Sequence, residues 1–297
     1  MRHQFDTVQR VTRISEREFI DQHLHAGKPV LISGLCAEWE ACARWSPDYF
    51  RALAPTLRIP IKSYRDGNID VTQWTLGDYG DFLIKTEQSY TGVTSVDALP
   101  YCHDIPIFAI LTSIIDDCQP FPVQFLPAWY RKDWWKYAQF FLGPVDSLTP
   151  LHFDTLLTHN LFFQIKGRKR FTLYSADQMA FCGRRGWRWF DIDPEKPDLN
   201  KFPEYKQARP VEIIVEPGDI LYIPPGTLHH VRGLETSVSF NIDFHTKSSA
   251  LRALAASVRG MPSKSIYYNF LTALGVVCGI PDSIIFKYYR PYLSYVS

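Results

Sequence analysis

Between residues 139 and 244 the sequence is a series of short β-branched and aromatic runs, separated by glycine, proline and aspartate turns. Strands this short bury their apolar side chains when two sheets face each other or one sheet closes on itself. The pattern therefore predicts a mainly β fold, a sandwich or barrel, with its core at about residues 139–246. The predicted strands are 161–165, 171–174, 211–215, 220–223 and 237–244.

Helical patterns flank this β-rich segment. Ser15 and Glu18 form a capping box that opens a helix, and residues 29–32 follow as a buried strand. After the last predicted strand, apolar residues again recur at helical spacing. We therefore expect one domain over residues 1–246, with N-terminal α/β elements before the barrel, and a helical segment over residues 247–297.

The composition bears on partners and compartment. Lys and Arg total 32 and Asp and Glu total 31, so neither nucleic acid nor an anionic membrane is the default partner, although a local basic surface for nucleic acid stays open. No apolar run reaches the roughly 20 residues that a membrane span needs. The six cysteines are scattered without a C-x-x-C pair, and the N-terminal residues are polar. These features favour a cytoplasmic protein.

The sequence His152-Phe153-Asp154 provides the main chemical signal. Residues i and i+2 of a strand face the same side, so His152 and Asp154 offer an imidazole and a carboxylate to one point. His229 and His230 follow a Pro-Gly turn, and one of them faces that point as a third ligand. Two histidines and one carboxylate form the facial triad of non-haem iron(II) oxygenases, but such residues also bind zinc for hydrolysis. Other histidines that are candidates for the third ligand position are His103, His159 and His245.

Several further motifs occur in order around this triad, and together they resemble the JmjC-type, cupin-like 2-oxoglutarate oxygenases. The chain looks closest to their small hydroxylase branch, which includes the asparaginyl hydroxylase that inhibits hypoxia-inducible factor. The similarity covers about residues 12–246 and implies a double-stranded β-helix, the jelly roll of the cupins. The matching motifs are 27–35 with Trp39, 149–154, 160–170, 193–198 with 202–203, and 217–224.

The resemblance implies a role for each matching residue. His152, Asp154 and His229 bind iron(II), because the family ligand follows the turn at the position of His229. Lys169 matches the lysine that pairs with the distal carboxylate of 2-oxoglutarate, whereas the residues alone also allow a solvated charge in a basic run. The remaining matches to residues near the cosubstrate are Thr149, Tyr101, Asn160 and Asn241.

The implied reaction is hydroxylation of an unactivated C–H bond with iron(II), 2-oxoglutarate and dioxygen. We expect the substrate to be an amino-acid side chain in a protein or peptide. The alternatives are demethylation of N-methyl-lysine, hydroxylation of a free amino acid or an RNA base, zinc-dependent hydrolysis, and a non-catalytic cupin that binds a ligand or partner. Retention of Lys169 and Thr149 beside three ligands argues against the last of these.

Three departures from the family pattern lie on the substrate side. Two extra residues separate Asp154 from Asn160, Phe141 stands where related hydroxylases can carry tryptophan, and Leu228 replaces an aromatic residue before the last ligand. The particular substrates of relatives therefore do not transfer to this chain.

Two further segments carry expectations about partners. The irregular segment 183–207 is expected to form one wall of a peptide groove, with its aromatic residues burying area and its arginines pairing with acidic neighbours of the target. The C-terminal helix is apolar over much of its girth, which predicts a homodimer through the C-terminal helices. The residues concerned are Trp187, Trp189, Phe190, Arg184, Arg185 and Arg188 in the first segment, and Ile266, Tyr267, Phe270, Leu271, Leu274 and Val277 in the second.

Overall fold

Fifteen strands are present in the computed structural model, which describes residues 4–65, 68–92 and 99–295. They are β1 (Gln9–Val11), β2 (Val30–Ile32), β3 (Arg58–Arg65), β4 (Asn68–Thr75), β5 (Cys102–Ile105), β6 (Ala138–Gly143), β7 (Leu148–His152), β8 (His159–Lys166), β9 (Lys169–Tyr174), β10 (Arg184–Arg185), β11 (Trp189–Phe190), β12 (Val211–Val215), β13 (Ile220–Ile223), β14 (Leu228–Gly233) and β15 (Ser237–Phe244).

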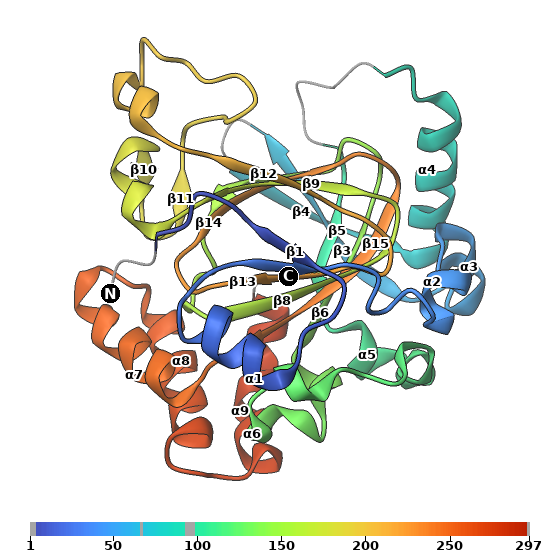
Figure 1. The fold of residues 1–297 in the computed structure, drawn as a ribbon. Helices are drawn as coiled ribbons and strands as arrows, with labels where there is room; N and C mark the ends of the chain where they lie inside the picture. The colour runs from blue at the N-terminus through green and yellow to red at the C-terminus, as the bar shows by residue number, and fades with distance from the viewer. Residues whose placement is uncertain (1–3, 66–67, 93–98, 296–297) are drawn as a thin grey trace.

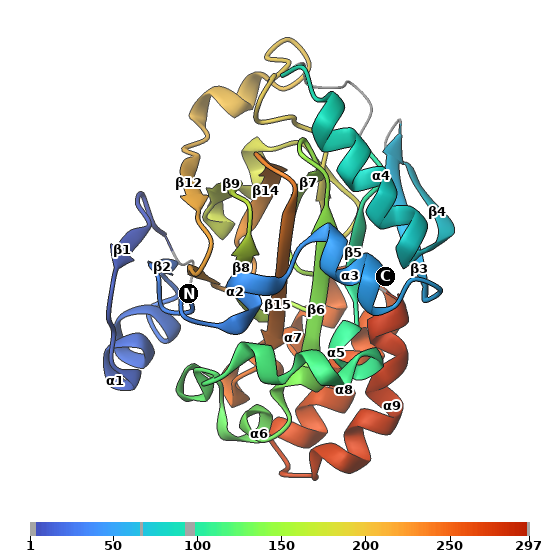
Figure 2. The same cartoon turned by 90° about the vertical axis from the view of Figure 1, so that its right-hand side faces the viewer.

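Two sheets packed face to face form the centre of the protein (Figures 1 and 2). The larger sheet has the strand order β1-β2-β13-β8-β15-β6-β5, and the smaller sheet has the order β10-β11-β7-β14-β9-β12. Strands β6 to β15, without the short β10 and β11, contribute four strands to each sheet and pair antiparallel. This arrangement is the double-stranded β-helix that the resemblance to the cupin-like oxygenases implied.

The five strands predicted from the residue pattern are all present. β12, β13 and β15 have the predicted limits, whereas β8 and β9 each begin two residues earlier than expected. These additions contain Asn160 and Lys169, polar positions that a search for apolar runs passes over. The difference places both residues on regular strands, and their backbones are therefore held by the sheet.

The strands of the larger sheet have an apolar outer face and an inner face on which polar and apolar side chains are mixed. On β15, Phe240 and Ile242 belong to the main hydrophobic core, while Ser239, Asn241 and Asp243 point to the opposite side, because successive side chains of a strand alternate. In the register between β15 and β8, Asp243 lies opposite Asn160. The inner face of this sheet therefore presents hydrogen-bonding groups to the space between the sheets.

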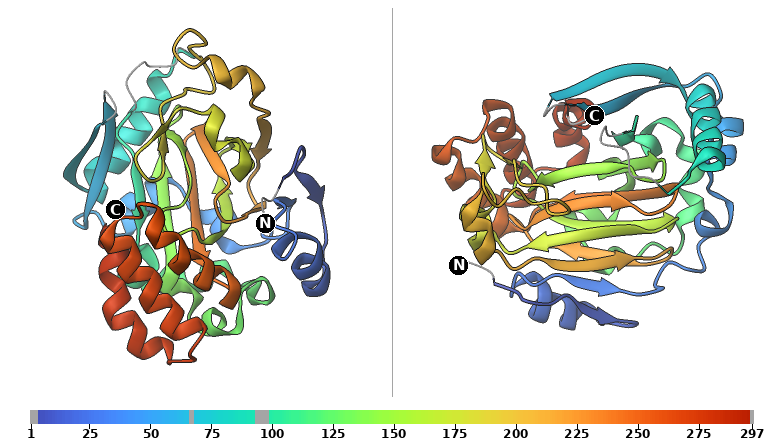
Figure 3. Two further views of the ribbon diagram at one scale, coloured as in Figure 1. Left: turned by 90° about the vertical axis from the view of Figure 1, so that its left-hand side faces the viewer. Right: turned by 90° about the horizontal axis from the view of Figure 1, so that it is seen from above.

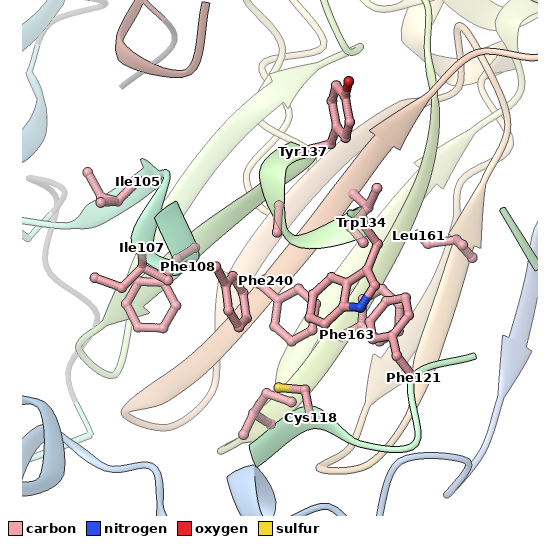
Figure 4. Close-up of a cluster of buried hydrophobic side chains, with 14 of the residues drawn as sticks. Ile105, Ile107, Phe108, Cys118, Phe121, Trp134, Tyr137, Leu161, Phe163 and Phe240 are labelled. Atoms are coloured by element: carbon pink, nitrogen blue, oxygen red, sulfur yellow. The ribbon is translucent and has the colours of Figure 1, made fainter. Parts of the chain in front are cut away.

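The main core covers the outer face of the larger sheet and is dominated by aromatic rings. Figure 4 shows Phe121, Trp134, Phe163 and Phe240 gathered on the sheet. The rings of Phe121 and Trp134 stack with centroids 3.7 Å apart, and those of Phe163 and Phe240 stack at 4.7 Å. Offset stacking of large rings adds to the stabilisation from area burial. This core fixes the sheet without using its inner face.

Short helices supply the other side of this core and flank the barrel. The predicted capping box is confirmed, since the Ser15 hydroxyl accepts from Glu18 N and the Glu18 carboxylate accepts from Ser15 N. The helix after it is one α-turn that continues as a π-helix over Phe19–Leu24. The α-helices are α1 (Glu16–Glu18), α2 (Glu40–Arg44), α3 (Pro47–Leu53), α4 (Leu76–Ser89), α5 (Ile107–Ile110), α6 (Ala128–Arg131), α7 (Lys247–Ala255), α8 (Ser263–Val276) and α9 (Asp282–Tyr295).

The three C-terminal helices pack side by side below the barrel (Figure 3, left). Helix α8 is tied to the end of β15, because His245 Nε2 and Asn269 Oδ1 lie 3.1 Å apart in a fully buried pair. The helices also contact the aromatic core through Tyr137, whose ring is packed against Phe286 and Tyr289. The division at residue 246 stays a prediction. Within the described residues, no helix has the length and apolar character that crossing a membrane requires.

Candidate metal centre and its pocket

Three side chains converge between the two sheets at one end of the barrel. His152 ends β7 and His229 lies on β14, where the two residues pair directly across the strands. Asp154 follows β7, and its Oδ1 lies 3.6 Å from His229 Nε2. One ligand-capable atom from each of the three lies within 4.8 Å of the others. The structure thus brings together the three residues predicted as metal ligands.

The path of the chain to Asp154 differs from the expected continuous strand. β7 ends at His152, the Phe153 amide donates to the Arg188 carbonyl over 3.1 Å, and Leu157 N donates to the Asp154 carbonyl over 2.8 Å. Leu157 adopts a φ of 57°, which closes this turn. The Asp154 carboxylate is therefore positioned beside the two histidines by a turn, whereas the sequence predicted that strand alternation would position it.

Both histidines are held by backbone carbonyls in one orientation. His152 Nδ1 lies 2.8 Å from the Pro150 carbonyl, and His229 Nδ1 lies 3.2 Å from the Thr227 carbonyl. Because a carbonyl oxygen only accepts, each Nδ1 carries the hydrogen and each Nε2 presents a lone pair. Burial, helped by repulsion from His229, lowers the pKa of His152 well below its usual value. A neutral imidazole is the form that binds a metal.

The neighbouring histidine faces the other side of the sheet. His230 lies close to Asp193 and Glu195, and burial lowers its pKa to about 4. Glu195 is bound by two arginines, with Arg232 Nε 3.1 Å from Glu195 Oε2 and Arg170 on the other carboxylate oxygen. Burial opposes ionisation of Glu195, but the guanidinium of Arg232, assisted by Arg170, lowers its pKa to about 2. This cluster is an ion-pair network in which cations already satisfy the carboxylate.

The other histidines that competed in the sequence also have partners elsewhere. His159 Nδ1 bonds with the Tyr222 hydroxyl over 2.7 Å, and His245 bonds with Ser249 and Asn269. His103 lines the pocket, and its Nδ1 lies 2.7 Å from the carboxylate of Asp104. His229 is thus the histidine that the fold aligns with His152 and Asp154.

Lys169 is buried at the start of β9 and faces the same pocket. Its Nζ donates to the Tyr101 hydroxyl over 2.9 Å and to the Ser239 hydroxyl over 2.8 Å. Among the described residues no carboxylate pairs with it, and burial alone lowers the pKa of its ammonium to about 7. An ammonium surrounded by neutral hydroxyls and aromatic rings in a cavity is a site for an anion.

The two predicted asparagines also line the pocket, each tied to a carboxylate. Asn160 Nδ2 donates to Asp154 Oδ2 over 3.3 Å, and Asn241 Nδ2 donates to Asp243 Oδ1 over 3.0 Å. The Oδ1 atoms of both amides are buried and have no hydrogen-bond partner among the described residues. Thr149 lines the same cavity from β7.

Several residues that line or support the pocket were not expected from the sequence. Ser239 and Asp243 flank Asn241 on β15, so the alternation of that strand is the signal that indicates them. Lys62 and Asp104 form a buried ion pair at 3.0 Å, which outweighs burial and lowers the pKa of Asp104. Lys62 and Asp104 are too far apart in the sequence for a local motif to indicate that they form a pair.

The segment 183–207 is partly regular, which corrects the expectation of an irregular loop. β10 and β11 form a hairpin, and Trp189 of β11 pairs with His152 at the edge of the smaller sheet. Trp189 and Arg188 line the pocket, with the guanidinium 4.5 Å from the centre of the indole ring. These two residues of the segment therefore line the pocket, and the peptide groove stays a prediction.

The other aromatic and basic residues of the segment are engaged within the protein. Phe190 is buried, Trp187 donates to the Thr155 carbonyl over 2.9 Å, and both belong to a small core beneath the hairpin. Arg184 bonds to the Trp187 carbonyl and Arg185 pairs with Asp191 at 2.7 Å. Their side chains fix the hairpin.

The fold and the residues converging in it define a jelly-roll protein with a two-histidine, one-carboxylate centre. Residues 15–250 match the family described as cupin-like domain, and the chain belongs to this family.

Three relatives show what the chain is similar to. It is 27% identical over 244 residues to lysine-specific demethylase 8 of Xenopus tropicalis, covering 77% of this chain and 50% of that protein. It is 35% identical over 130 residues to the 2-oxoglutarate and iron-dependent oxygenase JMJD4 of Gallus gallus, covering 40% and 30% of the two chains. It is 23% identical over 247 residues to the human bifunctional peptidase and (3S)-lysyl hydroxylase JMJD7, covering 72% and 76%.

The chain spans about half the length of the relatives named as lysine-specific demethylases. The particular likeness to the asparaginyl hydroxylase stays a prediction.

Burial of Lys169 predicts a pH-dependent stability. Its pKa is about 7 in the folded protein against an ordinary value of 10.5, so the unfolded chain binds more protons between these values. The free energy of unfolding of the metal-free protein should therefore rise as the pH increases from about 7 towards 10.5. Chemical denaturation across this window measures the effect. Lys169→Met should remove this rise, whereas Lys166→Met, at an exposed position on β8, should keep it. If the free energy of unfolding changed with pH in the same way in wild type and Lys169→Met, the prediction would be wrong.

Proposed function

We propose that this chain is an iron(II)- and 2-oxoglutarate-dependent oxygenase that hydroxylates an unactivated C–H bond. The observation that carries the proposal is the buried Lys169, whose ammonium lacks a carboxylate partner among the described residues, in the same pocket as the His152, Asp154 and His229 cluster. Two imidazoles and one carboxylate suit iron(II), and they would leave the ion open positions for further ligands. Lys169 suits the carboxylate at the cosubstrate's far end.

Bound at this centre, iron(II) with 2-oxoglutarate would supply the activation of dioxygen, with one oxygen atom inserted into the substrate and the cosubstrate converted to succinate and carbon dioxide. The chain's own residues orient the reactants. Lys169, together with the hydroxyls of Tyr101 and Thr149, holds the distal carboxylate. The carbonyls of Pro150 and Thr227 fix the imidazoles of His152 and His229.

Asn160 and Asn241 lie near the proposed positions of the cosubstrate and the metal. Asn160 orients the Asp154 carboxylate through its Nδ2. Asn241 is the next inward-facing residue of β15 after Ser239, the residue that accepts a hydrogen bond from Lys169. For either amide to donate to the cosubstrate, its Nδ2 would have to leave the carboxylate that it now contacts.

The proposed substrate is an amino-acid side chain in a protein or peptide. The human relative is named a lysyl hydroxylase and the Xenopus relative a lysine-specific demethylase, so both names concern amino-acid side chains. Trp189 and Arg188 at the pocket supply an aromatic face and a cation for such a chain. We also propose a cytoplasmic setting, which the six free cysteines support.

Removing a proposed ligand should remove iron(II) binding. Asp154→Ala and His229→Ala each leave two donors of the three, so both variants should lose tight iron(II) binding and 2-oxoglutarate consumption. His230→Ala is the matched control, since His230 faces the Glu195 network, and should retain iron(II). Calorimetric titration with iron(II) under anaerobic conditions measures this. Loss of iron in His230→Ala with retention in His229→Ala would reverse the assignment, and tight zinc with no iron-dependent activity would favour a hydrolase.

Neutralising Lys169 should weaken cosubstrate binding. Loss of a charge from a buried pair costs roughly 2–5 kcal/mol, so the Michaelis constant for 2-oxoglutarate should rise roughly thirtyfold or more in Lys169→Met. Arg168→Met is the control, because Arg168 pairs with Glu235 at 2.7 Å on the outside of the barrel. An unchanged constant in Lys169→Met, or a large rise in Arg168→Met, would show that another cation holds the cosubstrate.

A peptide-library screen tests the substrate class. Incubation with iron(II), 2-oxoglutarate and dioxygen should add the mass of one oxygen atom to one residue type, as detected by mass spectrometry. Parallel arms contain free amino acids, N-methyl-lysine peptides and RNA. Turnover confined to free amino acids or RNA, or loss of methyl groups in place of oxygen gain, would reject peptide hydroxylation in favour of the respective alternative.

We further propose a homodimer through the C-terminal helices. Leu271 packs inward, but Tyr267 and Phe270 of α8 are 46% and 50% exposed, and Tyr288 of α9 is 57% exposed. Large apolar side chains grouped on neighbouring helices are typical of a protein interface. Sedimentation at micromolar concentration should give a dimer, and Phe270→Asp should give a monomer. Val71→Asp, on the exposed β3–β4 hairpin, should remain dimeric. A monomeric wild-type chain would contradict the proposal.

A further inference from the structure

One buried carboxylate of the pocket has no counter-charge in contact with it. The ion pairs of the described pocket residues join Asp104 to Lys62 and His103, and Asp154 to His229. Asp243 belongs to none of them, although it is only 6% exposed and lines the cavity. Its neighbours are the uncharged Asn241 Nδ2, at 3.0 Å from Oδ1, and the Thr158 hydroxyl. A carboxylate so placed either takes up a proton or receives a cationic ligand.

The register of β15 places Asp243 away from the proposed cosubstrate anchor. Ser239, which binds Lys169, lies four residues before Asp243 on the same inward face, a distance of about 13 Å along a strand. Across the sheet Asp243 is opposite Asn160, whose Nδ2 contacts the metal-binding Asp154. Asp243 therefore lies at the metal end of the pocket, where a substrate would meet the centre.

Two further acceptors face this end of the pocket. The Oδ1 atoms of Asn160 and Asn241 are buried and without a hydrogen-bond partner among the described residues, because the Nδ2 of each amide is directed to a carboxylate. 2-Oxoglutarate offers no hydrogen-bond donor, so it cannot satisfy these oxygens. The wall formed by Asp243, Asn241 and Asn160 needs a ligand that is rich in N–H or O–H groups.

The charges of the loaded site favour a cation in particular. Iron(II), the Asp154 carboxylate, doubly charged 2-oxoglutarate and the Lys169 ammonium together carry no net charge. Asp104 is neutralised by Lys62. An ionised Asp243 would thus remain uncompensated in a buried site, apart from the more distant Arg188 at the pocket wall. A substrate with a positive side chain would supply the missing charge and the donors together.

We propose that Asp243, with the amide oxygens of Asn241 and Asn160, is a subsite for the nitrogen cation of the substrate, a guanidinium or primary ammonium group. The inference rests on the proposed function, since it assigns the substrate class of the same pocket. It makes Asp243 a specificity-determining residue, because a neutral isostere would leave the carboxylate without a counter-charge.

Ligand binding without turnover tests this subsite. The protein is loaded with zinc(II), which has no redox chemistry, and 2-oxoglutarate. The probes are the Nα-acetyl amides of arginine, lysine, citrulline and norleucine, titrated by calorimetry or ligand-observed NMR. We expect arginine to bind at least tenfold more tightly than citrulline, or lysine at least tenfold more tightly than norleucine. The two comparisons separate a guanidinium from an ammonium.

Substitution of the carboxylate completes the test. Asp243→Asn should abolish the preference for the cation while leaving the neutral probes unchanged. Asp116→Asn removes an exposed carboxylate remote from the pocket and should keep the preference. Thermal melting shows whether the variants fold, and if Asp243→Asn fails to fold, the wild-type comparison still decides. Equal binding of charged and neutral probes, binding of none, or a preference that survives Asp243→Asn overturns the proposal.

The outcome is separable from that of the proposed function. A protein that prefers the cations but never consumes 2-oxoglutarate with iron(II) would reject the oxygenase and leave the cation subsite standing. A protein that consumes 2-oxoglutarate but binds all four probes alike would reject the subsite alone.

Discussion

The alternation of side chains on the strands of the larger sheet is the constraint on which the rest of the structure depends. The outward residues Phe163 and Phe240 stack in the aromatic core, and that core is sufficient to hold the sheet against its covering helices. Some inward positions still pack between the sheets, as Phe162 and Leu221 do, but the remaining ones need not be apolar. Ser239, Asn241 and Asp243 can be polar because the same strand has already buried its apolar half on the other side.

The buried polar face is tolerated because most of its groups satisfy one another. Tyr101 and Ser239 accept from Lys169, Asn160 contacts Asp154, and Lys62 neutralises Asp104. What remains unsatisfied is located at two places: the ammonium of Lys169 and the acceptors around Asp243. The first calls for an anion and the second for a donor. A pocket that is positive at one end and negative at the other orients a bound pair of molecules before any chemistry begins.

Much of the fold was predictable because periodicity and turn residues are local. Three strands have the predicted limits, and the H-x-D pair with a distant histidine indicated the converging residues. The residue pattern alone did not decide between His229 and His230 as the third ligand. The pairing of β14 with β7 decides it, because this register places His229 opposite His152. The residue pattern also contained no signal for the Lys62–Asp104 ion pair, because tertiary contacts alone join these residues, whereas strand alternation around Asn241 could have indicated Asp243. The β10–β11 hairpin was not predicted, because strands of two residues are too short to show an alternation of apolar and polar side chains.

The Glu195 network has a consequence for how this scaffold can diversify. Arg170 of β9 and Arg232 of β14 bind Glu195 and so hold the middle of the 183–207 segment against the smaller sheet. Nearer the start of the segment, Trp189 pairs with His152 of β7. Both anchors attach the segment to strands of the smaller sheet, and residues 196–201, which follow Glu195, are exposed. Insertions, deletions and exchanges in this exposed stretch would leave the buried Phe190 and Ile192 undisturbed. Selection can thus redirect the protein to new targets through one tethered segment while its chemistry is inherited unchanged.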